Sequence, residues 1–356
     1  MTVARFIAVF FALLAATVPA KSQSPAGAPA LVTLLSCPLG CGLLEGNTMF
    51  SNLLARKGEN LSIAAQETPG FIYNIREMAD SKHWKRSIFG TDDWLIQLAP
   101  QGGKPAIKEF LPDPVPIRFK LLHGDAYWPQ GKFFVTTNPN IKTLADAKGK
   151  RISLGLRGQS NWGTAPRLLL EIGYGITPKN SDIRHMTPSQ ITQQLIDGAT
   201  DVIVTGFGTE PSGKRNLIPG PLRQLEASGR KIYYLAADEA AIQRVNKALG
   251  LTWIMIKVPA GTLPQQDKDM NVGASRGYKA AHADLPDDVA YRWVMLTHKY
   301  MEEMGKVDGL FGLLSSELMV DGLTEENTHP GAIRAFRELG IWDRRLKSTP
   351  VTYPAS

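Results

Sequence analysis

The stretch from residue 139 to residue 174 constrains the fold most, because it places a strand, a polar loop and a helix in direct succession. The run Ile152–Leu156 follows a Gly-Lys turn and alternates in hydrophobicity, which predicts a buried strand. Thr164 is the predicted N-cap of a helix that ends at Gly173. Helix N-termini attract anions, and open α/β sheets bind ligands at the carboxyl ends of their strands. The loop Gly155–Thr164 is therefore predicted to receive a carboxylate.

The same succession of strand, polar turn and helix recurs along the chain. Strands are predicted at Leu31–Leu35, Asn60–Ala65 and Ser87–Phe89, and later at Asp201–Thr205 and Lys231–Leu235. This alternation predicts an α/β fold with mostly parallel sheets flanked by helices. A mature length of about 330 residues exceeds what one hydrophobic core usually serves, and it predicts two lobes.

Two amphipathic helices are predicted near the C-terminus. The first follows Pro286, with apolar residues every three or four positions from Val289 to Met304. The second begins near Pro330 and stops at Gly340. We expect both helices to pack one apolar face against a sheet.

The first twenty residues have the pattern of a secretory signal. Arg5 precedes an apolar run from Phe6 to Ala16 that is too short to cross a bilayer, and small residues follow up to Ala20. We expect a signal peptide over 1–20, cleavage near Ala20, a flexible tether over 21–29 and a mature protein in the periplasm. A lipoprotein anchored at Cys37 is the minor alternative, because Cys37 lies far from the apolar run.

The charge and the cysteines exclude some classes of partner and leave one question open. The formal net charge is +7, which favours anionic partners, but the basic residues are scattered and form no stripe typical of nucleic-acid binding. Cys37 and Cys41 are the two cysteines. They either form a small disulfide loop or remain two thiols, since spacing alone does not settle pairing.

Local motifs of common enzyme classes are absent from the sequence. It contains no P-loop, no complete dinucleotide fingerprint, no nucleophile elbow and no His-Glu-x-x-His. The six histidines show no ligand spacing, and two cysteines do not complete a tetrahedral metal set. A triad assembled in space stays open. We therefore expect a protein that is not an enzyme and uses no cofactor and no metal.

Three segments carry a resemblance to a known family. The run IKTLADAKGKRISLGLRGQSNWGTAPRLLLEIGY at 141–174, VPAGTLPQQDKDM at 258–270 and HPGAIRAFRELG at 329–340 occur in this order. Together they resemble solute-binding proteins of TRAP transporters, specifically the TAXI family. The resemblance implies a two-lobed periplasmic-binding-protein fold with a ligand cleft between the lobes. It places lobe I at 30–130 and 258–356, with the C-terminal helices, and lobe II at 131–257.

In that family, turns at the strand ends of lobe I hold the ligand. The resemblance places Thr68 and Gly70 in one such turn, although Pro69 removes a backbone donor there. Thr91 and Asp92 match a second turn, for which helix capping is an equal explanation. Tyr127, near the expected crossing between the lobes, is predicted to line the cleft or to be buried in the core.

The resemblance assigns a larger set of ligand-binding residues to lobe II. Trp162 is a candidate aromatic wall, and Arg157 is either a clamp for a second carboxylate or a surface ion-pair partner. The first loop after Leu35 departs most from the family pattern and brings Glu45, which faces either an amino group or solvent. The predicted lobe II residues are Arg157, Ser160, Asn161, Trp162, Gly163, Thr164, Thr205, Gly206 and Phe207.

The resemblance implies an extracytoplasmic solute receptor of a TRAP-type secondary transporter. Such a receptor closes by hinge motion around a small organic anion, which we expect to be a dicarboxylate, an oxo acid or an amino acid such as glutamate. It is expected to be a monomer that delivers this solute to the transporter's membrane subunits. A receptor for an ABC importer or a tricarboxylate transporter, and an exported sensor or enzyme on the same scaffold, stay open as alternatives.

Overall fold

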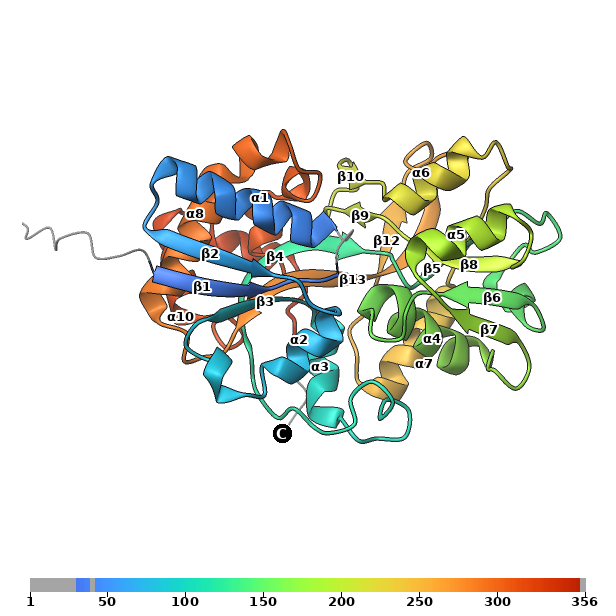
Figure 1. Cartoon of the computed structure of the whole chain (residues 1–356), viewed down its shortest axis with the longest axis horizontal. Helices are drawn as coiled ribbons and strands as arrows, with labels where there is room; N and C mark the ends of the chain where they lie inside the picture. Colours follow the sequence, from blue (N-terminus) through green and yellow to red (C-terminus); the bar gives the residue numbers. More distant parts are fainter. Residues whose placement is uncertain (1–29, 39–41, 353–356) are drawn as a thin grey trace, which may run out of the picture.

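Two β-sheets, each flanked by helices, divide the molecule (Figure 1). The structure is a computed structural model and describes residues 30–38 and 42–352. The predicted α/β class with two lobes is confirmed by this arrangement. The expected signal peptide and tether lie outside the described residues.

The first sheet has eight strands and joins distant parts of the chain. In its parallel part, β1 (Ala30–Leu35) lies between β2 (Leu61–Gln66) and β3 (Ser87–Asp92). The remaining strands are β4 (Lys120–Trp128), β9 (Gly208–Thr209), β10 (Asn216–Leu217), β12 (Ile254–Val258) and β13 (Met270–Ala281). Because β13 runs antiparallel to both β3 and β4, the sheet is mixed and only partly parallel.

The second sheet has five strands in the order β11-β5-β8-β6-β7. Its strands are β5 (Phe133–Thr136), β6 (Arg151–Leu154), β7 (Asp182–His185), β8 (Val202–Thr205) and β11 (Tyr233–Ala236). The predicted buried strand is β6, which is parallel to β7 and β8, whereas β5 is antiparallel to β8 and β11. Strand direction depends on where the chain enters a sheet, so local sequence does not reveal it.

The helices lie on both sides of each sheet. Beside the first sheet are α1 (Gly42–Lys57), α2 (Phe71–Glu77), α3 (Asp93–Leu98), α8 (Asp287–Gly305), α9 (Ser316–Met319) and α10 (Pro330–Glu338). Beside the second are α4 (Ala165–Leu168), α5 (Pro188–Ile196), α6 (Gly220–Ala227) and α7 (Glu239–Leu249). In Figure 1, α1 lies above the first sheet and α2 and α3 below it, while α5 and α6 lie above the second. Short 3-10 turns connect several of these elements.

The chain passes between the two sheets four times within the described residues. It leaves the first sheet after β4 and returns after β8, then leaves again after β10 and returns before β12. The range predicted for lobe II, 131–257, contains β9, β10 and most of β12. These strands nevertheless belong to the first sheet. The lobe boundaries remain a prediction. Each crossing places a connecting segment of the chain between the two sheets.

The helix after β6 begins earlier than the sequence predicts. A π-helical turn over Ser160–Thr164 precedes α4, and a second one over Leu169–Gly173 follows it. The N-cap prediction for Thr164 is wrong, because its backbone is already helical and its Oγ1 donates to the carbonyl of Arg157 at 2.9 Å. This earlier start moves Ser160 and Asn161 into the first turn.

The core of the first lobe is built around aromatic rings from α1 and α8. Trp293, 2% exposed, packs edge-on against Phe50 with ring centroids 5.9 Å apart. Phe50 also meets Phe311 at 5.2 Å. This cluster fixes α1 and α8 to each other, and α1 in turn begins at the cavity described below.

We expect Trp293→Ala to lower the free energy of unfolding by about 3–5 kcal/mol, because it removes a large buried ring and leaves a cavity. Denaturant unfolding followed by circular dichroism measures the change. Val307→Ala is the matched control, since Val307 is 68% exposed, and it should shift stability by less than about 0.5 kcal/mol. Equal effects of the two substitutions would contradict the proposed packing.

Candidate functional site

A cavity of about 530 Å³ opens between the two sheets. We call it the cleft, and its described lining comes from three sources. The first lobe supplies Cys37, Pro38, Gly42, Leu43, Glu45, Gly70, Phe71 and Leu310. The second supplies Leu156, Gln159–Trp162 and Thr187–Ser189. The crossings supply Trp128, Gln130, Gly206–Gly208 and Leu217–Pro221.

Three helices of eight residues or more begin at the cleft. They are α1 at Gly42, α5 at Pro188 and α6 at Gly220. A capping box fixes the start of α5, where Thr187 and Gln190 each bind the backbone of the other. Helix N-termini carry partial positive charge and unpaired N–H groups. The cleft therefore offers donors to a carbonyl, carboxylate or sulfonate oxygen.

Glycines allow the two sides of the cleft to approach closely. Gly70 has φ +133°, and a Cβ there would lie 3.1 Å from the carbonyl oxygen of Gly158 in the opposite lobe. At Gly206 a Cβ would lie 2.4 Å from the Cα of Gln130. A side chain at Gly70 would therefore disturb a contact between the lobes, and one at Gly206 would push two crossing segments apart.

A carboxylate of the first lobe occupies the donors of the loop that was predicted to bind a ligand. Asp92, at the end of β3, is fully buried. Its Oδ2 accepts hydrogen bonds from Asn161 Nδ2 at 2.9 Å and from Ser160 Oγ at 3.4 Å. The predicted carboxylate receptor thus receives a carboxylate of the protein itself, and these bonds join the two lobes.

Lys132 lies behind Asn161 and completes this arrangement. Its Nζ donates to Ser275 Oγ at 2.8 Å and to Asn161 Oδ1 at 3.5 Å, and it lies 4.7 Å from the ring centroid of Trp253. Asn161 therefore bridges the buried cation and the buried carboxylate of Asp92. Burial and the loss of solvation lower the pKa of Lys132 to about 8, although Asp92 and Asp93 oppose the shift.

Burial likewise raises the pKa of Asp92 to about 7. Lys132 opposes this rise, neighbouring Asp93 adds to it, and the hydrogen bonds from Asn161 and Ser160 oppose it. The folded protein therefore holds a proton on Asp92 at pH values where the unfolded chain has lost it.

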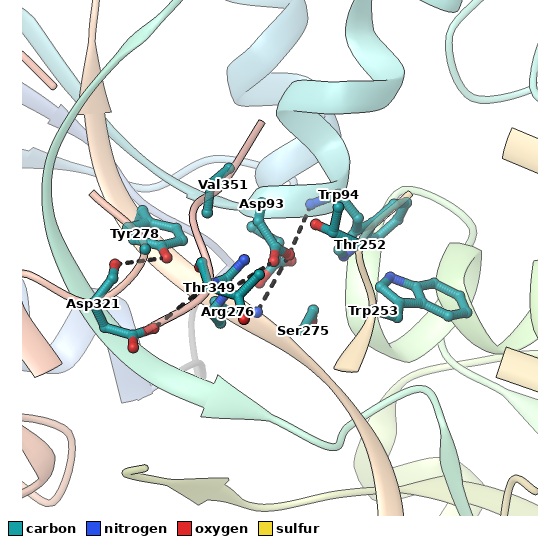
Figure 2. A network of polar contacts seen from close by, with 12 residues as sticks. Asp93, Trp94, Thr252, Trp253, Ser275, Arg276, Tyr278, Asp321, Thr349 and Val351 are labelled. Atoms are coloured by element: carbon teal, nitrogen blue, oxygen red, sulfur yellow. Dashed lines mark hydrogen bonds and ion pairs between the residues drawn. The ribbon is translucent and has the colours of Figure 1, made fainter. Parts of the chain in front are cut away.

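A second buried network continues from Asp93 away from the cleft (Figure 2). Arg276 Nε lies 3.2 Å from Asp93 Oδ2, and its Nη1 lies 3.8 Å from Asp321 Oδ2. Tyr278 donates its hydroxyl to the carbonyl of Asp321 at 2.9 Å. These contacts connect β13 to the start of α3 and to the C-terminal segment. They hold Asp93 in position beside Asp92.

Arg157 is an ion-pair partner in this structure and does not line the cleft. Its Nη1 lies 2.5 Å from Glu109 Oε1, and its side chain is 62% exposed. Arg167 binds the other oxygen of Glu109. The sequence left two roles open for Arg157, a clamp for a ligand carboxylate and a surface ion-pair partner. The structure shows the ion pair, which joins the lobes at the surface.

Several predicted site residues line the cleft and the others do not. Those in the lining are Gly70, Ser160, Asn161, Trp162, Gly206 and Phe207. Thr68 donates to the carbonyl of Ser36 at 3.0 Å, and Thr91 to that of Asp92 at 3.3 Å. The residues outside the lining are Thr68, Thr91, Asp92, Tyr127, Arg157, Gly163, Thr164 and Thr205.

Reasoning from sequence missed the starts of α5 and α6 and the side chain of Gln130 as parts of the site. The Thr187-Pro188-Ser189-Gln190 capping box marks where α5 begins, so the sequence did contain that signal. It did not show which helix ends face the cleft. Glu45, for which the sequence leaves an amino group or solvent as its partner, belongs to the lining, and so does Trp128.

Cys37 forms a disulfide bond, and Cys41 lies outside the described residues. Over 30–38 and 42–352, no group of three or more His, Cys, Asp or Glu residues is arranged to hold a metal ion. None of the helices in this described part is long and apolar enough to cross a membrane.

Comparison with known proteins gives a family match and several structural likenesses. A protein-family model described as the NMT1-like family matches residues 126–340. An R. palustris protein with adipate is 12% identical, covers 90% of this chain and 95% of its own, and has a TM-score of 0.47. MatC from Rhodopseudomonas palustris with bound malate is also 12% identical, with 90% and 99% covered and a TM-score of 0.44. The alkanesulfonate-binding protein SsuA from Xanthomonas axonopodis pv. citri bound to MOPS is 16% identical, with 93% and 88% covered and a TM-score of 0.41.

The raised pKa of Asp92 predicts a pH dependence of stability. Between about pH 4 and 7 the folded state binds more protons at Asp92 than the unfolded state, so this group's contribution to stability falls as pH rises. Relative to Asp92→Asn, the wild type should lose up to about 1.4 kcal/mol per pH unit in this window. Urea unfolding at a series of pH values measures the difference, and parallel curves for the two proteins would refute it.

We expect Asn161→Asp to open the lobes, because it places a second carboxylate beside Asp92 and removes a donor. Losing such a buried bond costs about 1–3 kcal/mol. Small-angle X-ray scattering at pH 8 should show a larger radius of gyration than for the wild type. Asn138→Asp is the control, since Asn138 caps a turn with its Oδ1 2.9 Å from the backbone N of Asn140. Superimposable curves for Asn161→Asp and the wild type would count against the bridge between the lobes.

Proposed function

This chain belongs to the NMT1-like family, and from that premise we propose that it is an extracytoplasmic solute receptor that binds a small organic molecule in the cleft and delivers it to a membrane transporter. The observation that carries the proposal is the cavity of about 530 Å³ between two lobes, lined by loops and helix starts from both. Ligand sites of this kind bury most of a small molecule and orient it with a few polar groups.

The lobe contacts support a mechanism of closure around the solute. Asp92 bonds to Ser160 and Asn161, and Glu109 to Arg157 and Arg167, each across the boundary between the sheets. Both sets are polar, as expected for an interface that opens and closes. The solute adds its own contacts to both lobes and thereby shifts the population toward the closed form.

The finer expectations from the resemblance are part of this proposal. The chain would serve a TRAP-type transporter as a TAXI-like receptor, with the ligand drawn from the organic anions, oxo acids and amino acids. The helix starts at Gly42, Pro188 and Gly220 support binding of an anionic or carbonyl group. TRAP membrane subunits encoded by neighbouring genes would favour this partner, and ABC importer or tricarboxylate transporter genes would overturn it.

Export with cleavage near Ala20 fits the first sheet better than a lipid anchor on Cys37. Anchoring requires cleavage directly before the cysteine, which would remove β1 from its position between β2 and β3. It would also use the sulfur that forms the disulfide. We therefore propose a periplasmic protein freed from its leader.

A thermal-shift screen of the mature protein tests the receptor function. A ligand at a concentration about 100 times its Kd stabilises the native state by about 2.7 kcal/mol, which raises the melting temperature. Calorimetry then gives the stoichiometry, and the bound compound is extracted and identified. Recovery of the unchanged compound supports a receptor, whereas turnover during incubation would show an enzyme.

We expect Trp162→Ala to weaken binding of any ligand found in this screen by about tenfold or more, which is about 1.4 kcal/mol. Trp162 is partly buried and lines the cleft, so its ring supplies contact area to the ligand. Trp84→Ala is the control, because Trp84 stacks on His282 at 4.1 Å and is not part of the lining. Equal affinities for wild type and Trp162→Ala would mean that the ligand binds elsewhere.

A further inference from the structure

The charge of the cleft differs from what an organic dianion requires. Within the described lining, Glu45 is the one residue with a charged side chain, and none of the lining residues is a lysine or an arginine. Residues 39–41, which precede Gly42 in the sequence and lie outside the described part, are Leu, Gly and Cys. Among the described lining residues, the side chains therefore supply one negative charge and no positive one.

Cations near the boundary of the lobes already have protein partners. Lys132 is fully buried behind Asn161, Arg276 is paired with Asp93, and Arg157 binds Glu109. The donors of Ser160 and Asn161 are bound to Asp92. A ligand carboxylate would find helix starts to bind, but no side-chain cation to neutralise it.

Glu45 is in a position to act on a ligand. It lies in the first turn of α1, which places its carboxylate at the same end of the cleft as Gly42 and Leu43. Within the described residues it has no ion-pair partner, and its charge adds to the effect of burial in raising the pKa of Asp308. The Glu45 side chain is exposed, and a positive group entering the cleft would be attracted to its carboxylate.

Aromatic rings complete the chemistry of the lining. Phe71, Trp128 and Trp162 border the same cavity as Glu45. Ring faces attract cations and accommodate flat or apolar groups, and this attraction strengthens where water is excluded. A carboxylate together with tryptophan rings is a combination that selects an ammonium or a protonated nitrogen base.

We propose that the ligand carries a basic nitrogen that donates to the carboxylate of Glu45, with an apolar or aromatic body against Trp128 and Trp162. An acidic or carbonyl group at the other end binds at the helix starts of α5 and α6. The ligand class is thus a zwitterion of the amino-acid type or an organic cation, and the cleft discriminates against dicarboxylates. This inference rests on the proposed receptor function and narrows its substrate class.

A charge-matched panel tests the assignment in the wild-type mature protein. The panel contains organic acids, amino acids and amines, including the trio tryptamine, tryptophan and indole-3-propionate, which share one ring and differ in charge. Compounds that raise the melting temperature are titrated by calorimetry at pH 7. We expect the tightest binder to contain a basic nitrogen, and we expect adipate and malate to bind at least tenfold more weakly.

The variant Glu45→Gln then separates charge from shape. It keeps the length of the side chain and removes its charge, so it should weaken the tightest binder by tenfold or more. Glu302→Gln is the control, because Glu302 is an exposed acid of α8 outside the lining, and it should leave affinity unchanged. Both variants should retain the melting temperature of the unliganded wild type.

The outcomes distinguish this inference from the proposed function. A tight ligand without a basic nitrogen, or equal affinity of wild type and Glu45→Gln for a nitrogen base, overturns the charge assignment and leaves the receptor function standing. If no compound of any class binds, the receptor function fails and this inference fails with it.

Discussion

Contact between the two lobes depends on how the buried charges of Asp92 and Lys132 are neutralised around Asn161. We call these three residues the floor of the cleft. Asp92 comes from the end of β3, Lys132 precedes β5, and Asn161 lies in the first turn after β6. Removing one partner from such a set leaves a buried charge uncompensated, which costs several kcal/mol. The amide of Asn161 satisfies the acid with its N–H and the amine with its oxygen, so this neutral side chain is one of the links between the two lobes. Asp93 and Arg276 anchor the same floor from below.

This arrangement leaves the space above the floor for a ligand. Because Asp92 takes the donors of Ser160 and Asn161, the proposed receptor would recognise its ligand through the helix starts, the aromatic rings and Glu45. Those groups come from both lobes and from the crossings, so a bound molecule would touch every part that moves on closure. In the proposed receptor, the site would be complete only when the lobes meet, so that binding and closure would be coupled.

Much of the fold followed from local patterns, and less of the site did. The long helix after Pro286 is α8 (Asp287–Gly305) and the last predicted helix is α10 (Pro330–Glu338), because their apolar spacing permits one buried face. The capping box that begins α5 also has a local sequence signal, Thr187-Pro188-Ser189-Gln190. The N-cap at Thr164 was wrong, since the π-helical turn that begins at Ser160 has no simple sequence signal. Among the site residues, Thr91 and Thr205 lie on strands and are buried, because they belong to β3 and β8 and not to the turns that follow.

The sequence by itself determined the strand-loop-helix succession, the α/β class and the polar character of the loop after β6, since these depend on neighbours within a few residues. Tertiary structure alone decided that β13 runs antiparallel through the first sheet and that three of the four crossings line the cleft. It also decided that Arg157 pairs with Glu109, 48 residues away, and that Asp92 occupies the predicted anion receptor. Such pairings depend on which distant groups the fold buries together. A charged group that has lost its water must be paired with a group that the fold places beside it.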